Sequence, residues 1–339
     1  MIGIGLIGYG YWGPNLLRNF AEMPDARVVA CCDLRAERRA LIERRYPDIR
    51  TTVSADEVID DPAVDAVLIA TPISTHYELA HKVLLSGKHV FIEKPITTNT
   101  AHADALIELA ESRHLTLMVD HTFIYTGAVR KMKEMITRGE VGDIYYFDSV
   151  RVNLGLFQHD VNVIWDLAPH DLSIMDFLLD QKPDAVSAVG ACHIGQQMEN
   201  IAYLNLHFSD NLIGHVHVNW LAPVKLRKTL ISGSRKMIVY DDMETSEKIK
   251  VYDAGVSIRQ DTESIYQTLV QYRTGDMYAP KLDQREALSV ECAHFIDCVT
   301  TGSTPDSDGR GGRRVVAILE AAHQSLKTNG EWVSIRMSL

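Results

Sequence analysis

The stretch IGIGLIGYGYWG, residues 2–13, decides the fold of the first part of this chain. Its first half is an apolar run interrupted only by glycine, which is typical of a parallel strand buried on both faces. Residues 8–13 then follow the pattern G-x-G-x-x-G, whose glycines permit a tight turn, close approach of a pyrophosphate and close packing of the next helix. The stretch predicts a strand, a phosphate-binding loop and a helix, with cofactor contacts at Gly8, Gly10, Tyr11, Trp12 and Gly13.

An acidic residue follows this loop at the distance expected for a ribose-binding group. The next apolar run, residues 28–32, ends at Asp33, about 20 residues beyond the glycines. A carboxylate there accepts hydrogen bonds from the ribose hydroxyls of NAD and repels the 2′-phosphate of NADP. NAD is therefore the predicted cofactor and NADP the less favoured one, although the guanidinium of Arg35 could contact a 2′-phosphate.

Short apolar runs alternate with amphipathic stretches as far as residue 122, which predicts a doubly wound parallel sheet with helices on both faces. From residue 123 the pattern changes to successive strand-like segments, several of which alternate polar and apolar residues. These predict an antiparallel sheet with one buried face. Helices are expected over residues 165–179, 284–300 and 312–326. The α/β chain is thus divided into a Rossmann domain, residues 1–122, and a substrate-binding, catalytic and oligomerisation domain, residues 123–339.

Composition argues against several classes of protein. The formal net charge of −11 over 339 residues disfavours nucleic acid as a partner, because phosphate binding needs a basic face. The five cysteines show no zinc-binding or disulfide spacing, so a reduced, cytoplasmic protein without a metal site is expected. Neither a signal peptide nor a membrane-spanning segment is expected.

Two predicted strand ends carry polar residues. Carboxyl ends of parallel strands line the ligand crevice in such sheets, so the residues that follow the apolar runs 64–70 and 89–92 are predicted to border the cofactor. They are Thr71, Pro72, His76, Glu93, Lys94 and Pro95. His76 could equally begin a helix without touching the cofactor. Lys94 could stabilise negative charge on a reacting oxygen, whereas a lone lysine at a strand end is usually a surface residue.

Asp166 and His170 are four residues apart, which places both on one face of a helix. A histidine with a nearby carboxylate suits proton transfer during hydride chemistry. Pro169 is tolerated only near a helix start, so the pair is expected in the first turn or just before it. Two alternatives stay open: Asp166 caps the helix while His170 packs as a polar residue, or the pair binds a metal, for which a third ligand is not evident.

Together these motifs resemble the glucose–fructose oxidoreductase, inositol dehydrogenase and rhizopine-catabolism family (Gfo/Idh/MocA), over essentially the whole chain. The resemblance implies a second domain built on a large open, mainly antiparallel sheet, whose exposed face packs against another subunit in a homodimer or homotetramer. It implies a nicotinamide cofactor and a sugar or polyol substrate. It also implies that Lys94 and His170 are the catalytic pair, with Asp166 as their partner.

The segments 165–171 and 272–276 look like family members from nucleotide-sugar and surface-polysaccharide pathways. The predicted function is hydride transfer between a nicotinamide and a ring hydroxyl or ketone of a nucleotide-linked sugar. A free sugar or inositol is the alternative substrate, and a non-catalytic NAD(P)-binding regulator is the alternative class of protein. A basic cluster could hold an anionic substrate group or form a solvated loop; its members are Lys225, Arg227, Lys228, Arg235 and Lys236.

Overall fold

The computed structural model describes residues 1–155, 161–194, 198–259 and 269–337, and the chain divides into two compact units. The parallel-sheet unit comprises Met1–Thr126 and Arg285–Glu320, and the antiparallel-sheet unit comprises Gly127–Gln284 and Ala321–Met337. This division differs from the predicted one, which assigned residues 123–339 to one domain. The C-terminal segment 285–320 returns to the first unit because its Phe295 packs edge-to-face against Phe20 and Phe91, with ring centroids 6.1 and 5.4 Å away.

The parallel-sheet unit is the doubly wound fold that the sequence predicts. Its strands pair in parallel in the order β3-β2-β1-β4-β5-β6. In chain order they are β1 (Ile2–Ile7), β2 (Ala26–Cys32), β3 (Arg50–Thr52), β4 (Ala66–Ile69), β5 (His89–Glu93) and β6 (Leu117–Asp120). This order joins two mononucleotide-binding halves, with the ligand crevice at the carboxyl ends where the order reverses between β1 and β4.

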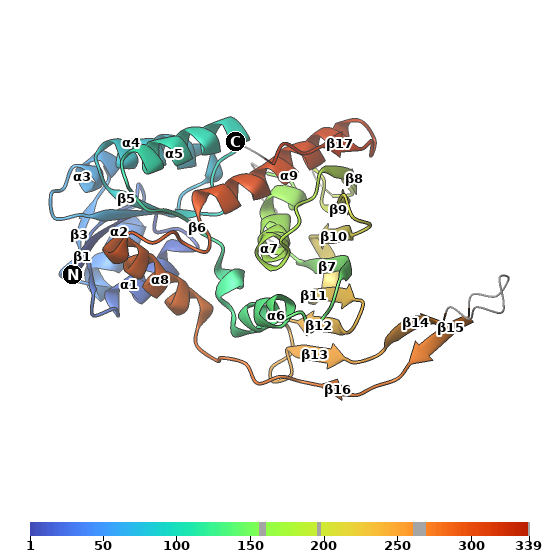
Figure 1. The fold of residues 1–339 in the computed structure, drawn as a ribbon. Coiled ribbons are helices and arrows are strands. Elements are labelled where there is room, and N and C mark those ends of the chain that lie inside the picture. Colours follow the sequence, from blue (N-terminus) through green and yellow to red (C-terminus); the bar gives the residue numbers. More distant parts are fainter. Residues whose placement is uncertain (156–160, 195–197, 260–268, 338–339) are drawn as a thin grey trace. The chain divides into compact units, whose positions relative to one another are not determined.

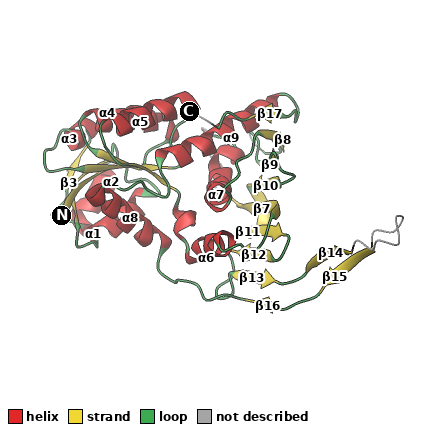
Figure 2. Ribbon diagram, viewed as in Figure 1, coloured by secondary structure: helices red, strands yellow, loops and turns green. Residues whose placement is uncertain are grey.

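Helices cover both faces of this sheet, with α4 and α5 on one face and α1 and α8 on the other (Figures 1 and 2). The helical segments of this unit are α1 (Gly13–Ala21), α2 (Ala36–Arg45), α3 (Ala55–Ile59), η1 (Ile73–Thr75), α4 (His76–Leu85), α5 (Thr100–Ser112), η2 (Thr122–Tyr125) and α8 (Ala287–Thr301), together with the first part of α9 (Gly309–Lys327).

The antiparallel-sheet unit is built on a sheet of nine strands among the described residues, in the order β16-β13-β12-β11-β7-β10-β9-β8-β17. All neighbours are antiparallel except β7 and β10, so the prediction of a mainly antiparallel sheet is confirmed. The strands are β7 (Ile144–Leu154), β8 (Ala185–Ala191), β9 (Ile201–His207), β10 (Ile213–Asn219), β11 (Leu221–Gly233), β12 (Met237–Asp241), β13 (Ile249–Tyr252), β16 (Met277–Tyr278) and β17 (Val333–Ser334). A separate hairpin pairs β14 (Gly255–Arg259) with β15 (Leu269–Arg273), and the unit's helices include α6 (Gly127–Thr137) and α7 (Val163–Leu178).

Side chains of the nine-stranded sheet alternate between two faces. The apolar residues of β9 and β10 that are buried, such as Leu204 and Val216, occupy every second position, and α7 packs against these strands. The intervening positions include exposed apolar side chains, such as Tyr203 and Ile213. No helix among the described parts of the chain is long and apolar enough to cross a membrane.

Candidate functional site

The loop between β1 and α1 has the geometry that its three glycines predict. Gly8 has φ +97°, and a Cβ there would lie 2.4 Å from the carbonyl oxygen of Ala70. A Cβ on Gly13 would lie 2.1 Å from the carbonyl oxygen of Gly8, whereas one on Gly10 would meet nothing closer than Arg35 at 3.8 Å. Gly8 and Gly13 thus permit the tight turn and the helix packing, and the open side of Gly10 leaves the backbone accessible to a pyrophosphate.

The N-terminus of α1 is available to an anion. Its N-cap residue, Trp12, makes no side-chain capping hydrogen bond, so the first amides of the helix are not capped by that side chain. These amides and the positive end of the helix dipole attract phosphate oxygens. The residues present therefore fit the pyrophosphate of a dinucleotide, which would be held by the backbone around Gly10 and by the start of α1.

Asp33 lies immediately after β2 and is held in place by the backbone. Its carboxylate accepts hydrogen bonds from the amides of Tyr9, at 2.8 Å, and Arg35, at 2.9 Å. The Nε atom of Arg35 lies 3.5 Å from the same carboxylate. Each carboxylate oxygen can accept a further hydrogen bond, so Asp33 is suited to a ribose, and the guanidinium of Arg35 forms its ion pair with Asp33.

If Asp33 held the adenosine ribose, the nicotinamide half of the cofactor would lie near the carboxyl ends of β4, β5 and β6. Thr71 and Pro72 follow β4, Glu93 ends β5, and Lys94 and Pro95 come next. Since β4 and β5 pair in parallel, these ends lie at the same edge of the sheet. The side chains at this edge range from partly buried to exposed, except for the buried Pro95.

His76 is the first residue of α4. Its side chain is 1% exposed, and its two ring nitrogens each lie 2.9 Å from a backbone oxygen, those of Thr71 and Pro95. Burial lowers the pKa of His76, which favours the neutral ring. His76 therefore joins the loops after β4 and β5, and its contact with the cofactor stays a prediction.

Two carboxylates that sequence reasoning missed, Asp120 and Glu291, lie near the predicted Glu93. Asp120, at the end of β6, accepts hydrogen bonds from Trp12 Nε1 at 2.6 Å and Thr122 Oγ1 at 2.5 Å. Desolvation and the charge of Asp120 raise the pKa of Glu93, and also that of Glu291 on α8, well above the ordinary carboxyl value. Asp120 could have been found because it ends an apolar run; Glu291, inside a helix, carries no such signal.

The helix that carries Asp166 and His170 begins at Val163, two residues earlier than predicted, and Asn162 caps it by accepting a hydrogen bond from the amide of Trp165. Asp166 is therefore not the cap. Pro169 lies within the helix, where it cannot donate the usual backbone hydrogen bond, and not at its start as predicted. His170 follows one turn after Asp166 on the same face, and both side chains are partly exposed.

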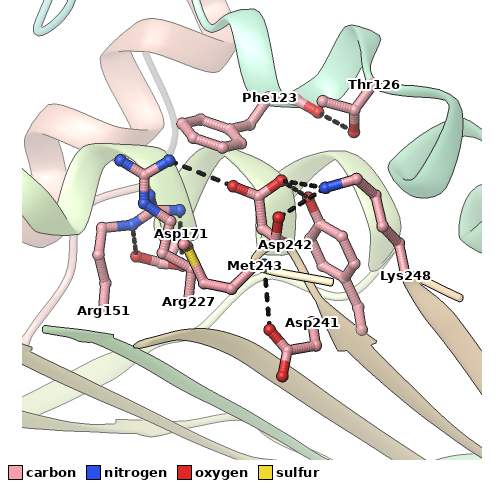
Figure 3. A network of polar contacts seen from close by, with 10 residues as sticks. Phe123, Thr126, Arg151, Asp171, Arg227, Asp241, Asp242, Met243 and Lys248 are labelled. Atoms are coloured by element: carbon pink, nitrogen blue, oxygen red, sulfur yellow. Dashed lines mark hydrogen bonds and ion pairs between the residues drawn. The ribbon is translucent and has the colours of Figure 1, made fainter. Parts of the chain in front are cut away.

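Two polar contacts anchor this helix to the sheet, one of them fully buried. The indole Nε1 of Trp220 donates a hydrogen bond to Asp166 Oδ2 at 2.9 Å. Asp171 accepts hydrogen bonds from Arg151 Nε at 2.6 Å and from Ser149 Oγ at 2.7 Å, and this pair lies close to Arg227 (Figure 3). Sequence reasoning missed both Trp220 and Arg151, although Trp220 follows the alternating pattern of β10.

The basic cluster is largely paired with acidic groups. Arg227 lies 3.2 Å from Asp242, as Figure 3 shows, and Lys228 lies 3.2 Å from Asp241. Arg235 donates to the carbonyl of Gly139, and Lys236 lies 3.7 Å from Glu140. The nearest partners of these four cations are thus the protein's own acceptors, which argues against a dedicated anion site. Lys225, Arg227 and Lys228 lie on β11, so the alternative of a solvated loop is wrong for these three. Within the described residues, no group of three or more His, Cys, Asp or Glu is arranged to hold a metal ion.

Family models match most of both units. Residues 2–121 match the model described as "Oxidoreductase family, NAD-binding Rossmann fold". Residues 129–239 match the model described as "GFO/IDH/MocA C-terminal domain". The first match contains the glycine loop, Asp33 and the strand ends with Lys94, and it confirms NAD as the cofactor class. The second contains α7 with Asp166 and His170.

Similar proteins align with nearly the whole chain. The UDP-N-acetylglucosamine 3-dehydrogenase of Acidithiobacillus ferrooxidans is 27% identical over 92% of this chain and 93% of its own. A solved structure of that enzyme has a TM-score of 0.82 at 25% identity, over 96% of this chain and 98% of the other. The myo-inositol 2-dehydrogenase of Thermotoga maritima is 24% identical over 96% of each chain. The WlbA dehydrogenase of Bordetella pertussis, solved with NADH and UDP-GlcNAcA, shares the fold with a TM-score of 0.83 at 19% identity, over 99% of this chain and 98% of its own.

Proposed function

Because the chain belongs to the Gfo/Idh/MocA family of oxidoreductases, as its motifs predicted, we propose that it transfers a hydride between NAD and a ring hydroxyl or ketone of a nucleotide-linked sugar. The observation that carries the proposal is that the chain has both an open glycine loop for the cofactor and the polar groups needed for proton transfer. Those groups are Lys94, which follows β5, and Asp166 with His170 on α7.

The chemistry assigns one task to each of these side chains. Oxidation of an alcohol removes a hydride from carbon and a proton from oxygen, and bound NAD supplies the acceptor for the hydride. His170 takes the proton, because an imidazole has a pKa close to neutral pH. Asp166 orients that ring and stabilises the imidazolium. Lys94 remains a cation and stabilises the developing negative charge on the substrate oxygen.

The proposed nucleotide-sugar substrate is supported by the similarity to known dehydrogenases, and not by the basic cluster. The relative from A. ferrooxidans is named for a UDP-linked sugar and aligns along nearly the full length of this chain. The ion pairs of Arg227 and Lys228 remove the basic cluster as an argument for a diphosphate site. The T. maritima relative, named for myo-inositol, supports a free polyol as the second candidate.

A substrate screen tests the proposal. The protein is incubated with NAD and one of three alcohols, UDP-N-acetylglucosamine, UDP-GlcNAcA or myo-inositol, while the absorbance of the NADH formed is followed. We expect turnover with a nucleotide sugar. Turnover of the free polyol without binding of either nucleotide sugar would reject the nucleotide-linked substrate but retain the dehydrogenase. Tight binding of NAD with no turnover of any candidate would favour the non-catalytic regulator.

A further inference from the structure

We propose that Trp220 is a positioning residue for the proton-transfer pair: its indole N–H holds the carboxylate of Asp166 in the orientation that His170 requires. This inference rests on the proposed function, since it assigns to Trp220 a task that acts through Asp166. Trp220 is not expected to touch the substrate or the cofactor.

The contact joins a buried donor to a partly exposed carboxylate. The Nε1–Oδ2 distance is 2.9 Å, and Trp220 is 1% exposed whereas Asp166 is partly exposed. An indole N–H can only donate, so Oδ2 must be an acceptor in this contact. An α-helix fixes the direction of the Cα–Cβ bond but not the rotation of a carboxylate about it. The indole supplies the constraint that α7 alone does not.

The backbone of Trp220 is held by hydrogen bonds at the junction of β10 and β11. The amide of Trp220 donates to the carbonyl of Asn200 at 2.9 Å, and its own carbonyl accepts from the amide of Gly155 at 3.1 Å. A Cβ at Gly155 would lie 2.6 Å from Cδ1 of the Trp220 ring. Gly155 therefore leaves the space that the ring fills, and any larger residue there would displace the ring.

The position of Trp220 in the sheet explains why the contact is suited to catalysis. Asp166 belongs to α7, and Trp220 follows β10, one of the strands against which α7 packs. The carboxylate is consequently placed relative to the sheet as well as to its own helix. A proton acceptor is efficient only if its orienting group is held in one geometry, and a displacement of about 1 Å can cost up to roughly a hundredfold in rate.

Two substitutions separate this role from simple packing. Trp220→Phe removes the N–H but keeps an aromatic ring, and Gly155→Ala moves the ring but keeps the donor. We expect each to lower kcat by about tenfold, with KM and the Kd for NAD within about twofold. Trp332→Phe, at an exposed indole of the same unit, is the matched control and should change none of these values.

The decisive measurement is a double-mutant cycle with Asp166→Ala, using the sugar that is turned over fastest in the screen, with UDP-N-acetylglucosamine as the first probe. If Trp220 acts through Asp166, Trp220→Phe should have no further effect on kcat in the Asp166→Ala background. Equal losses in both backgrounds would show a packing role and overturn the inference. If Trp220→Phe does not fold, the same cycle is completed with Gly155→Ala.

A substrate-independent measurement accompanies the cycle. The titration of the His170 ring, followed by NMR of histidine-labelled protein, should move in Trp220→Phe towards the curve of Asp166→Ala. An unchanged curve would overturn the inference without affecting the proposed function. By contrast, normal kcat in His170→Ala would reject the proposed role of His170 whatever the behaviour of Trp220.

Discussion

At the scale of single residues, the proposed chemistry divides between Lys94 and His170. Replacing either by alanine removes an oxyanion-stabilising cation or a proton acceptor, so kcat should fall by roughly a hundredfold or more. His170→Ala should leave the Kd for NAD nearly unchanged, because His170 lies outside the unit that contains the glycine loop. Asp166→Asn should be milder than His170→Ala, since the proton acceptor remains. Near-normal kcat in His170→Ala would make Lys94 the base.

Asp33 should decide the choice between NAD and NADP. Its carboxylate is already fixed by two backbone amides and is free to accept from a ribose. We expect tighter binding of NAD than of NADP, and Asp33→Ala should weaken NAD binding by about tenfold, the scale of a lost hydrogen bond to a charged group. Arg35→Ala serves as the comparison. A large loss of NADP affinity in that variant, with NADP preferred by the wild type, would show that Arg35 overrides Asp33.

Glu291 predicts a pH dependence of folding stability. Its pKa is raised by burial, so between the ordinary carboxyl pKa and that raised value the folded state binds more protons than the unfolded state. Stability is therefore greatest below the ordinary carboxyl pKa and falls as the pH rises, by up to about 1.4 kcal/mol per pH unit. Glu291→Gln, a neutral isostere, should raise the Tm more at pH 8 than at pH 5.

Glu286, in the same segment 285–320, is the control, because its contribution to stability should have the opposite pH dependence. Its hydrogen bond from Arg18, at 2.5 Å, lowers the pKa of Glu286, so its contribution is present above the ordinary carboxyl pKa and is lost as the pH falls. Glu286→Gln should lower the Tm slightly at pH 8 and less at pH 4, because the pair is exposed. If the two variants showed the same pH trend, the raised pKa of Glu291 would be contradicted.

At the scale of secondary-structure elements, the attachment of α7 to β7 depends on a buried ion pair. Arg151 and Asp171 are 5% and 3% exposed and lie 2.6 Å apart. Asp171→Leu should reduce the free energy of unfolding by about 3–5 kcal/mol, because it leaves a buried guanidinium without this partner. The double variant Arg151→Met/Asp171→Leu should recover a large part of that loss. Denaturant unfolding measures both.

Asp180→Ala is the control for that pair. Asp180 also forms an ion pair in this unit, with Lys133 at 3.1 Å, but its side chain is 95% exposed. Its removal should leave the denaturation midpoint within error, because exposed pairs contribute little. A similar loss in Asp171→Leu and Asp180→Ala would show that burial is not what makes the Arg151 pair important.

At the scale of the whole molecule, the open face of the nine-stranded sheet predicts self-association. Its exposed apolar side chains come from several strands and include Val189, Tyr203, Ile213 and Leu226. Exposed apolar side chains gathered on one face of a sheet are typical of an interaction surface. We expect light scattering to report a dimer or tetramer of the 38.0 kDa chain. A mass near that of one chain at micromolar concentration would contradict this.

Substitutions test whether the open face of the nine-stranded sheet, and not another exposed apolar site, forms the interface. Tyr203→Lys together with Ile213→Lys should lower the mass measured in solution, because two charges would be buried at the interface. Val53→Lys, at an exposed position of the parallel-sheet unit, should not. Dissociation by Val53→Lys and not by the sheet variant would place the interface elsewhere.

The structure agrees with the sequence-based predictions wherever they depend on neighbouring residues in the chain. Gly8, Gly10 and Gly13 have the three environments that their spacing predicts, and the apolar runs become the strands of a parallel sheet. Disagreement begins at element boundaries: α7 starts two residues early because Asn162 provides the cap, and Pro169 is accommodated inside the helix. The cap at Asn162 is a local signal that the sequence-based boundary did not use, whereas the helical cost of Pro169, about 3 kcal/mol, is outweighed by the packing of α7 in the unit.

The sequence by itself determined the family, the cofactor class and the residues proposed to carry the chemistry, because each depends on residue types at short, fixed spacings. Only the tertiary structure showed which distant side chains form hydrogen bonds with the residues near the site. Trp12 meets Asp120 across 108 positions and Trp220 meets Asp166 across 54. It also decided that Phe295 packs with Phe20 and Phe91 in the first unit. Such contacts form where strand order and helix packing bring distant segments together, and no local period in the chain specifies that pairing.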